Sequence, residues 1–212
     1  MTNRDALIAT LSADLHSVKP ATQVDRVAAA WLFLSAIYVV AMTHFMGPAR
    51  SNAWSQLATE PRFLLECLGG LLAITIGALG AFRAAVPGAL SRRFLLLAIG
   101  LMPVWWSFYV VGLLEPGLEP SMQGKRPHCI WETFVYALPP MALAFLLTRR
   151  FYPLRPVSLA FSFSMVAGMI PALYMQIACM YSPAHILAFH LLPGVLVAIT
   201  GAAVAWMLAL RR

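Results

Sequence analysis

Long apolar segments alternate with short polar ones along this chain, and six of them are long enough to cross a lipid bilayer. A transmembrane helix needs about 20 consecutive, mostly apolar residues. Segments of this kind cover residues 27–46, 63–82, 94–113, 129–147, 157–178 and 185–210. The connections between them are too short to hold a soluble domain with its own core. The pattern therefore predicts an all-α polytopic membrane protein, with six transmembrane helices in one bundle over residues 27–212.

The N-terminal tail, residues 1–26, has a different pattern. Leu7, Ile8, Leu11 and Leu15 recur at helical spacing on one side, and Pro20 ends the pattern. This predicts a short amphipathic helix of about three to four turns. Such a helix is marginally stable alone in water, so we expect it to need a surface on which to fold.

The charges of the tail bear on what that surface is. Three acidic residues balance three basic ones, namely Asp5, Asp14 and Asp25 against Arg4, Lys19 and Arg26. A helix that binds an anionic leaflet is usually rich in basic residues. The balanced charge favours instead a helix that docks its leucine face into a groove of a soluble partner.

Composition and charge agree with a membrane protein. Of the 212 residues, 61% are hydrophobic and 11% are charged, and the net charge is +7. If the N-terminus is cytoplasmic, most of the basic residues flank the cytoplasmic ends of the spans, as the positive-inside rule expects. These are Arg4, Lys19, Arg26, Arg83, Arg92, Arg93, Arg149, Arg150, Arg155, Arg211 and Arg212, against Arg50, Arg62, Lys125 and Arg126 on the other side. We expect both termini to be cytoplasmic, and membrane lipids rather than nucleic acid to contact the basic residues.

The common signatures of catalysis are missing from the sequence. It contains no Walker loop, GxSxG, HExxH, CxxC or dinucleotide-binding motif. We therefore expect a protein that is not an enzyme and carries no cofactor.

Two cysteines are the main candidates for chemistry. Cys129 begins the fourth span and Cys179 follows the fifth, so the topology places both at the outer face at similar depth. Three interpretations remain open: small apolar residues packed at helix ends, a redox-active pair in an oxidising compartment, or a metal site with His128 and His185.

Other polar residues within the spans suggest rival functions. Glu66 and Glu132 are carboxylates near the outer helix ends, where a transporter could use them. His44 and His190 could ligate haem, but we expect them to be hydrogen-bonded core or interface histidines. The cysteines could serve a membrane thiol oxidoreductase or a quinone-linked electron carrier. No diagnostic spacing supports these alternatives, and Cys67 is expected to be an inert core thiol.

The stretch "LIATLSADLHSVKP" (residues 7–20), followed by six spans with a cysteine before the fourth and another after the fifth, resembles the NrsF family (negative regulator of sigma F). This family comprises anti-sigma factors of the bacterial inner membrane. The resemblance implies that the tail holds an extracytoplasmic-function sigma factor at the membrane. The matching positions are Leu7, Leu11, Asp14, Leu15 and Val18, and Ile8 lies on the same apolar face.

The resemblance also implies a signal. The family is associated with oxidative and heavy-metal stress, which makes Cys129 and Cys179 the expected sensing residues. His128, Glu132 and His185 are then possible auxiliary residues beside the two thiols.

Overall fold

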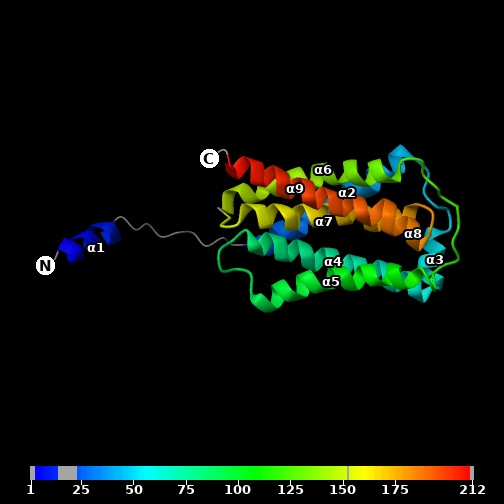
Figure 1. Ribbon diagram of the computed structural model, residues 1–212, viewed down its shortest axis with the longest axis horizontal. Coiled ribbons are helices and arrows are strands. Elements are labelled where there is room, and N and C mark those ends of the chain that lie inside the picture. Colours follow the sequence, from blue (N-terminus) through cyan, green and yellow to red (C-terminus); the bar gives the residue numbers. More distant parts are fainter. Residues whose placement is uncertain (1–2, 14–22, 152, 211–212) are drawn as a thin grey trace.

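The computed structural model describes residues 3–13, 23–151 and 153–210, and within these ranges every regular element is a helix (Figure 1). The elements are α1 (Asn3–Ala13), α2 (Val24–Met46), α3 (Ala53–Thr59), α4 (Pro61–Ala84), α5 (Arg92–Gly112), α6 (Cys129–Thr148), the 3₁₀ turn η1 (Arg149–Phe151), α7 (Pro156–Ala178), α8 (Pro183–Ile186), the π-helical segment η2 (Leu187–Leu191) and α9 (Leu192–Leu210). Six helical segments are long and apolar enough to cross a membrane. The predicted fold class and its six spans are confirmed. The short helix α3 was not predicted.

The six spans form one antiparallel bundle, so its two ends carry different segments (Figure 1). The tail end holds the first residues of α2, α5 and α7 and the last residues of α4, α6 and α9. The cysteine end holds α3, α8, the connection 113–128 and both Cys129 and Cys179. The tail and the two cysteines therefore belong to opposite ends of the bundle.

Helix α7 lies at the centre of the bundle. It packs against α9, α6, α4 and α2, and it is the most buried of the six spans. Small residues permit its close contact with α9: a Cβ atom on Gly168 would lie only 2.6 Å from the Gly194 carbonyl oxygen. Such small-residue contacts let membrane helices approach closely.

The outer surface of the bundle is apolar, as a lipid environment requires. On α2, Phe33, Leu34 and Ile37 are each more than half exposed. Exposed apolar side chains of this kind also lie on α4, α5, α6 and α9, and such a surface would be unfavourable in water but matches hydrocarbon. The protein is a membrane protein by this criterion as well as by span length.

An ion pair joins two spans at the tail end. The Arg83 guanidinium donates to Asp25 with a shortest distance of 2.6 Å, and it also lies 4.4 Å from the centre of the Phe94 ring. These contacts join the start of α2 to α4 and α5. The start of α2, the helix that follows the tail, is therefore linked through Arg83 to two other spans.

Helix α1 leaves its predicted apolar face uncovered. Leu7, Ile8 and Leu11 are 59, 54 and 62% exposed, and Figure 1 shows α1 apart from the bundle. The helix begins at Asn3 and is described to Ala13. The predicted contact residues Asp14, Leu15 and Val18 lie outside the described residues.

Candidate functional site

Cys129 and Cys179 meet at the cysteine end. Cys129 is the first residue of α6, Cys179 directly follows α7, and their Sγ atoms lie 3.2 Å apart. Both side chains are buried and both thiols are free. The expected proximity of the two cysteines is thus present, in a geometry that suits either a shared proton or a shared ligand.

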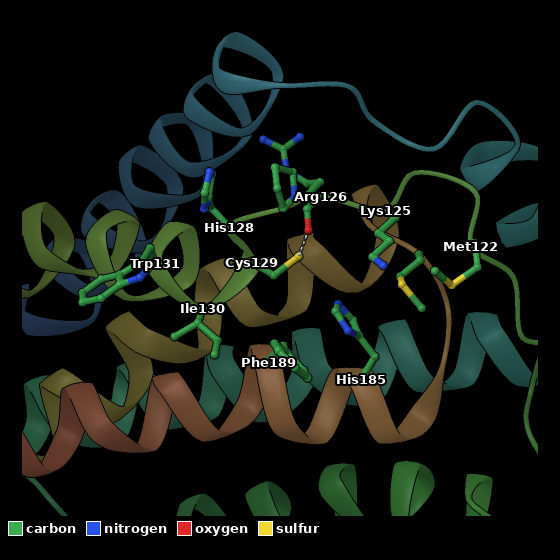
Figure 2. A pocket seen from close by; sticks show the side chains of 11 residues that line it. Met122, Lys125, Arg126, His128, Cys129, Ile130, Trp131, His185 and Phe189 are labelled. Atoms are coloured by element: carbon green, nitrogen blue, oxygen red, sulfur yellow. Dashed lines mark hydrogen bonds between the residues drawn. The ribbon is translucent and has the colours of Figure 1, made fainter.

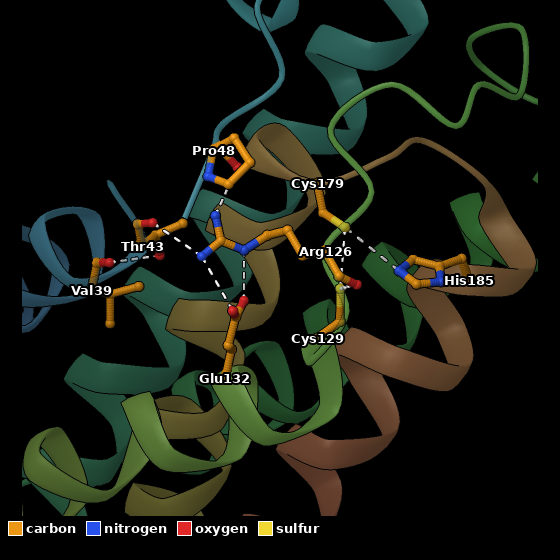
Figure 3. A network of polar contacts seen from close by, with 8 residues as sticks. All are labelled: Val39, Thr43, Pro48, Arg126, Cys129, Glu132, Cys179 and His185. Carbon is orange, nitrogen blue, oxygen red and sulfur yellow. Dashed lines mark hydrogen bonds and ion pairs between the residues drawn. The ribbon is translucent and has the colours of Figure 1, made fainter. Parts of the chain in front are cut away.

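His185 lies beside this pair. Its Nε2 atom is 3.6 Å from Cys179 Sγ, and Figure 3 shows the imidazole directed at that sulfur from the α8 segment. The ring stacks on Phe189, with ring centres 4.6 Å apart. The expected auxiliary role of His185 is therefore compatible with its position.

His190 is a fourth member of the cluster. It is fully buried, and its ring centre lies 4.9 Å from that of His185. One potential ligand atom from each of Cys129, Cys179, His185 and His190 lies within 4.8 Å of all the others. The described residues thus bring two thiols and two imidazoles together.

The π-helical segment explains how the two histidines share a face. Residues five apart in a regular α-helix point in different directions, whereas a π turn, with its i→i+5 hydrogen bonds, places them one turn apart. The Leu192 N–H donates to the Leu187 carbonyl, which is a bond of this type. Pro193 has no N–H to donate to the Phe189 carbonyl, so the regular α pattern is interrupted at this point. His185 and His190 therefore both reach the sulfurs.

A pocket of about 520 Å³ gives access to the cluster from the cysteine end (Figure 2). Its lining includes Cys129 and His185 together with the thioethers of Met122 and Met180. Figure 2 shows His185 facing this space from one side and His128 on the other. The pocket therefore borders two of the four clustered residues, while Cys179 and His190 lie behind them, fully buried.

The cluster also changes the acidity of one thiol. A hydrogen bond from Cys129 lowers the pKa of Cys179 well below its ordinary value, although burial acts in the opposite direction, and the hydrogen bond from His185 lowers it further. The thiolate is the form that reacts with oxidants and binds metals. The contacts with Cys129 and His185 thus favour the thiolate form at Cys179.

A buried arginine holds the connection that precedes Cys129 (Figure 3). Arg126 donates to Glu132 at 2.6 Å and to the carbonyl oxygens of Pro48 and Thr43 at 2.8 and 3.2 Å. Burial by itself lowers the pKa of Arg126, but the hydrogen bond and charge of Glu132 outweigh burial and raise it. Arg126 thereby ties α6 to the end of α2.

Glu132 has a structural partner in this arrangement. It shares α6 with Cys129, but its carboxylate faces Arg126 and is not one of the four clustered residues. Its expected auxiliary role beside the thiols is therefore indirect, through the position of Arg126 and the loop.

Glu66 belongs to a second buried network. Its carboxylate accepts hydrogen bonds from the Tyr181 hydroxyl at 2.9 and 3.0 Å and from Gln176 Nε2 at 3.3 Å. Tyr109 donates to Gln176 and accepts from Trp105. Burial and the charge of Glu66 raise the pKa of Tyr181 above its ordinary value. Glu66 is fully buried, so its carboxylate does not lie at the membrane–water interface, although its position near the start of α4 would have allowed this.

The remaining polar candidates lie apart from the cluster. His128 lines the pocket but is not among the four clustered residues. His44 is hydrogen-bonded to the Tyr174 hydroxyl at 2.6 Å, so it and His190 have different neighbours. Cys67 is buried and accepts a long contact from Gln176 Nε2 at 3.7 Å.

The sequence pattern did not reveal the roles of two residues at the cysteine end of the bundle. His190 was expected to be a hydrogen-bonded core or interface histidine, but neither of its ring nitrogens has a hydrogen-bond partner among the described residues. A spacing of five residues does not place it on one α-helical face with His185. Pro193 was the available signal, since a proline at that position interrupts the α pattern. Arg126 was counted for topology alone, and its burial depends on contacts with α2 that are distant in sequence.

The fold and this end of the bundle define a class: a six-span helical membrane protein with an exposed N-terminal helix and a buried thiol–imidazole cluster at the opposite end. The family model described as NrsF, negative regulator of sigma F, matches residues 11–211. The chain belongs to this family, and it is accordingly a negative regulator of a sigma factor. No curated protein and no solved structure matches this chain.

Proposed function

We propose that this protein is an anti-sigma factor of the bacterial inner membrane that holds an extracytoplasmic-function sigma factor through its N-terminal segment. Oxidative or heavy-metal stress at Cys129 and Cys179 then releases the sigma factor. The exposed apolar face of α1 is the observation that carries this proposal. A negative regulator of a sigma factor can act by binding it directly, and Leu7, Ile8 and Leu11 form an apolar helix face that the bundle leaves uncovered.

The proposed mechanism of inhibition is occlusion. An amphipathic helix binds by placing residues at i, i+3, i+4 and i+7 in an apolar groove. The face of α1 supplies Leu7, Ile8 and Leu11, and the segment that follows would add Asp14, Leu15 and Val18. A sigma factor whose groove is filled in this way is held at the membrane and kept from RNA polymerase. No catalytic step is needed.

The proposed orientation places the tail end in the cytoplasm. Basic side chains are concentrated at that end, as the positive-inside rule expects of a cytoplasmic face. They are Arg26, Arg83, Arg92, Arg93, Arg149, Arg150 and Arg155, whereas the cysteine end has Arg50, Arg62, Lys125 and Arg126. Both termini are then cytoplasmic, and the two thiols face the compartment in which disulfides persist.

The proposed signal acts on the two thiols. Hydrogen peroxide accepts two protons and two electrons from the two thiols: each thiol loses its hydrogen, the two sulfurs join, and the O–O bond breaks to give two molecules of water. The sulfurs already lie 3.2 Å apart, so little movement is needed. Heavy-metal ions would bind the same two sulfurs in their thiolate form. Either event changes how the starts of α6 and α8 sit on the end of α7.

The tail is tested by matched substitutions on α1. Full-length protein in detergent is used to capture its partner from the native cell extract, and sigma factors are identified by mass spectrometry. Leu11→Glu places a charge on the apolar face, and Ala9→Glu places the same charge about 200° away on the helix. We expect capture of a sigma factor by the parent and by Ala9→Glu, and its loss in Leu11→Glu. Equal capture by both variants would contradict the proposed role of α1.

A further inference from the structure

Two histidines extend the cysteine pair into a cluster of four potential ligands. Cys129, Cys179, His185 and His190 each present one ligand atom within 4.8 Å of the other three. The two sulfur atoms lie 3.2 Å apart, and Cys179 Sγ lies 3.6 Å from His185 Nε2. In a tetrahedral zinc site with the usual bond lengths, neighbouring ligand atoms are separated by roughly 3.5 Å. The four side chains therefore approach this geometry without a change of fold.

His190 supplies an independent indication of a ligand. Its side chain is fully buried, and among the described residues neither ring nitrogen has a hydrogen-bond partner. Burial of a polar group without a partner is costly, and buried polar groups in folded proteins are usually satisfied. A cation bound to one of these nitrogens would remove part of that cost. Packing alone does not require an imidazole at this position.

The backbone around His190 is also specialised. A π-helical turn between α8 and α9 brings residues 185 and 190 onto one face. Isolated π turns inside helices are frequently found at functional sites. Here the turn directs both imidazoles at the two sulfurs, which come from two other helix ends.

The donor set selects a class of cation. Thiolate and imidazole ligands favour zinc and similar soft divalent ions, whereas magnesium, calcium and manganese prefer carboxylate and carbonyl oxygens. Glu132, the carboxylate one turn from Cys129 on α6, is engaged by Arg126. The thioethers of Met122 and Met180 line the pocket that leads to the cluster, and thioethers are themselves weak, soft ligands.

We propose that Cys129, Cys179, His185 and His190 together form one binding site for a soft divalent cation such as Zn²⁺ or Cd²⁺. The cation would join the first turn of α6, the end of α7 and the α8–η2 segment through four bonds. This site would be the sensor in the regulation proposed above, so its role in releasing the sigma factor rests on the proposed function. Cation binding itself is independent of the tail.

The test is direct binding of Cd²⁺ to the purified, reduced, full-length protein in detergent. Equilibrium dialysis gives the stoichiometry, and the ultraviolet charge-transfer absorption of the cadmium–thiolate bonds follows the titration. We expect one ion per chain. His185→Gln and His190→Gln are each expected to weaken binding by at least about tenfold, a loss that even outer-shell partners of a metal can cause. His128→Gln, which changes a pocket residue outside the cluster, is expected to bind like the parent.

Co²⁺ provides a second readout that reports coordination rather than affinity. A tetrahedral site with two sulfur and two nitrogen ligands gives intense visible bands, and loss of either histidine is expected to change their position and intensity. His185 is only partly buried, so its substitution tests the site even if the His190 variant does not fold.

The outcomes separate this proposal from the proposed function. Unchanged Cd²⁺ affinity and an unchanged Co²⁺ spectrum in His185→Gln would overturn the four-ligand site, while tail-dependent capture of a sigma factor would stand. Conversely, histidine-dependent binding of one ion per chain supports the site even if Leu11→Glu captures sigma factor like the parent.

Discussion

The sulfur atoms of Cys129 and Cys179 lie 3.2 Å apart, although fifty residues separate them along the chain. Two helix ends hold them there: the first residue of α6 and the residue that follows α7. A pair at this distance can form a bond or share a ligand with little rearrangement. A signal that arrives at the cysteine end of the bundle can therefore act by changing the bonding of these two sulfur atoms.

Selective oxidation is the first prediction. Mild treatment with peroxide is expected to join Cys129 to Cys179 and to spare Cys67, because the first two sulfurs already lie in contact whereas Cys67 contacts Gln176 and has no neighbouring thiol. Peptide mapping under non-reducing conditions checks this. A Cys67→Ala variant is expected to form the same linkage at the same rate. Modification of Cys67 before the other two would contradict the assignment.

Arg126 is predicted to be a major determinant of stability at this end. Arg126→Met leaves the Glu132 carboxylate without its buried partner, and breaking such a pair typically costs about 3–5 kcal/mol. The midpoint of thermal unfolding in detergent is expected to fall markedly. The double variant Arg126→Met with Glu132→Leu is expected to recover part of the loss, because no unpaired charge remains. A double variant less stable than Arg126→Met would rule out this explanation.

Tyr181 is predicted to stabilise the buried Glu66 carboxylate. Tyr181→Phe removes the hydroxyl that donates to both Glu66 oxygens and is expected to reduce the free energy of unfolding by about 1–3 kcal/mol. Tyr38→Phe is the matched control, since it removes the same hydroxyl from a partly exposed side chain. Chemical denaturation in mixed micelles measures both changes. Equal effects would show that the Glu66 contact contributes nothing specific.

Pro193 is predicted to affect the thiol–imidazole cluster without touching it. Pro193→Ala restores the N–H that a regular α-helix would use, which favours an α turn and turns His190 away from His185. Cd²⁺ affinity is expected to fall about tenfold or more, as for other changes to groups that orient metal ligands. Dialysis against Cd²⁺ checks this. Retained affinity in a folded Pro193→Ala protein would show that the π turn does not depend on this proline.

Much of the fold was predictable because apolar run length reports directly on transmembrane helices. All six spans were placed within a few residues of their observed ends, and Cys129 with Cys179 was assigned to one end from the order of the spans alone. His190 and Arg126 were less accessible. The direction of His190 depends on a local departure from α geometry, and the burial of Arg126 depends on contacts with carbonyl groups of Thr43 and Pro48, more than seventy residues away. Patterns of hydropathy carry neither kind of information.

The central claim is that chemistry at the cysteine end changes the hold of the tail on a sigma factor, and affinity measures it most directly. The sigma factor captured with the parent protein is purified, and its dissociation constant for the full-length protein is determined in the reduced state, after peroxide and with Cd²⁺. We expect peroxide or Cd²⁺ to weaken binding by at least about fivefold, the lower range of typical coupling between sites. The same treatments are expected to have no effect on a protein carrying both Cys129→Ser and Cys179→Ser. Unchanged affinity in the parent, or an equal change in the double variant, would contradict the account.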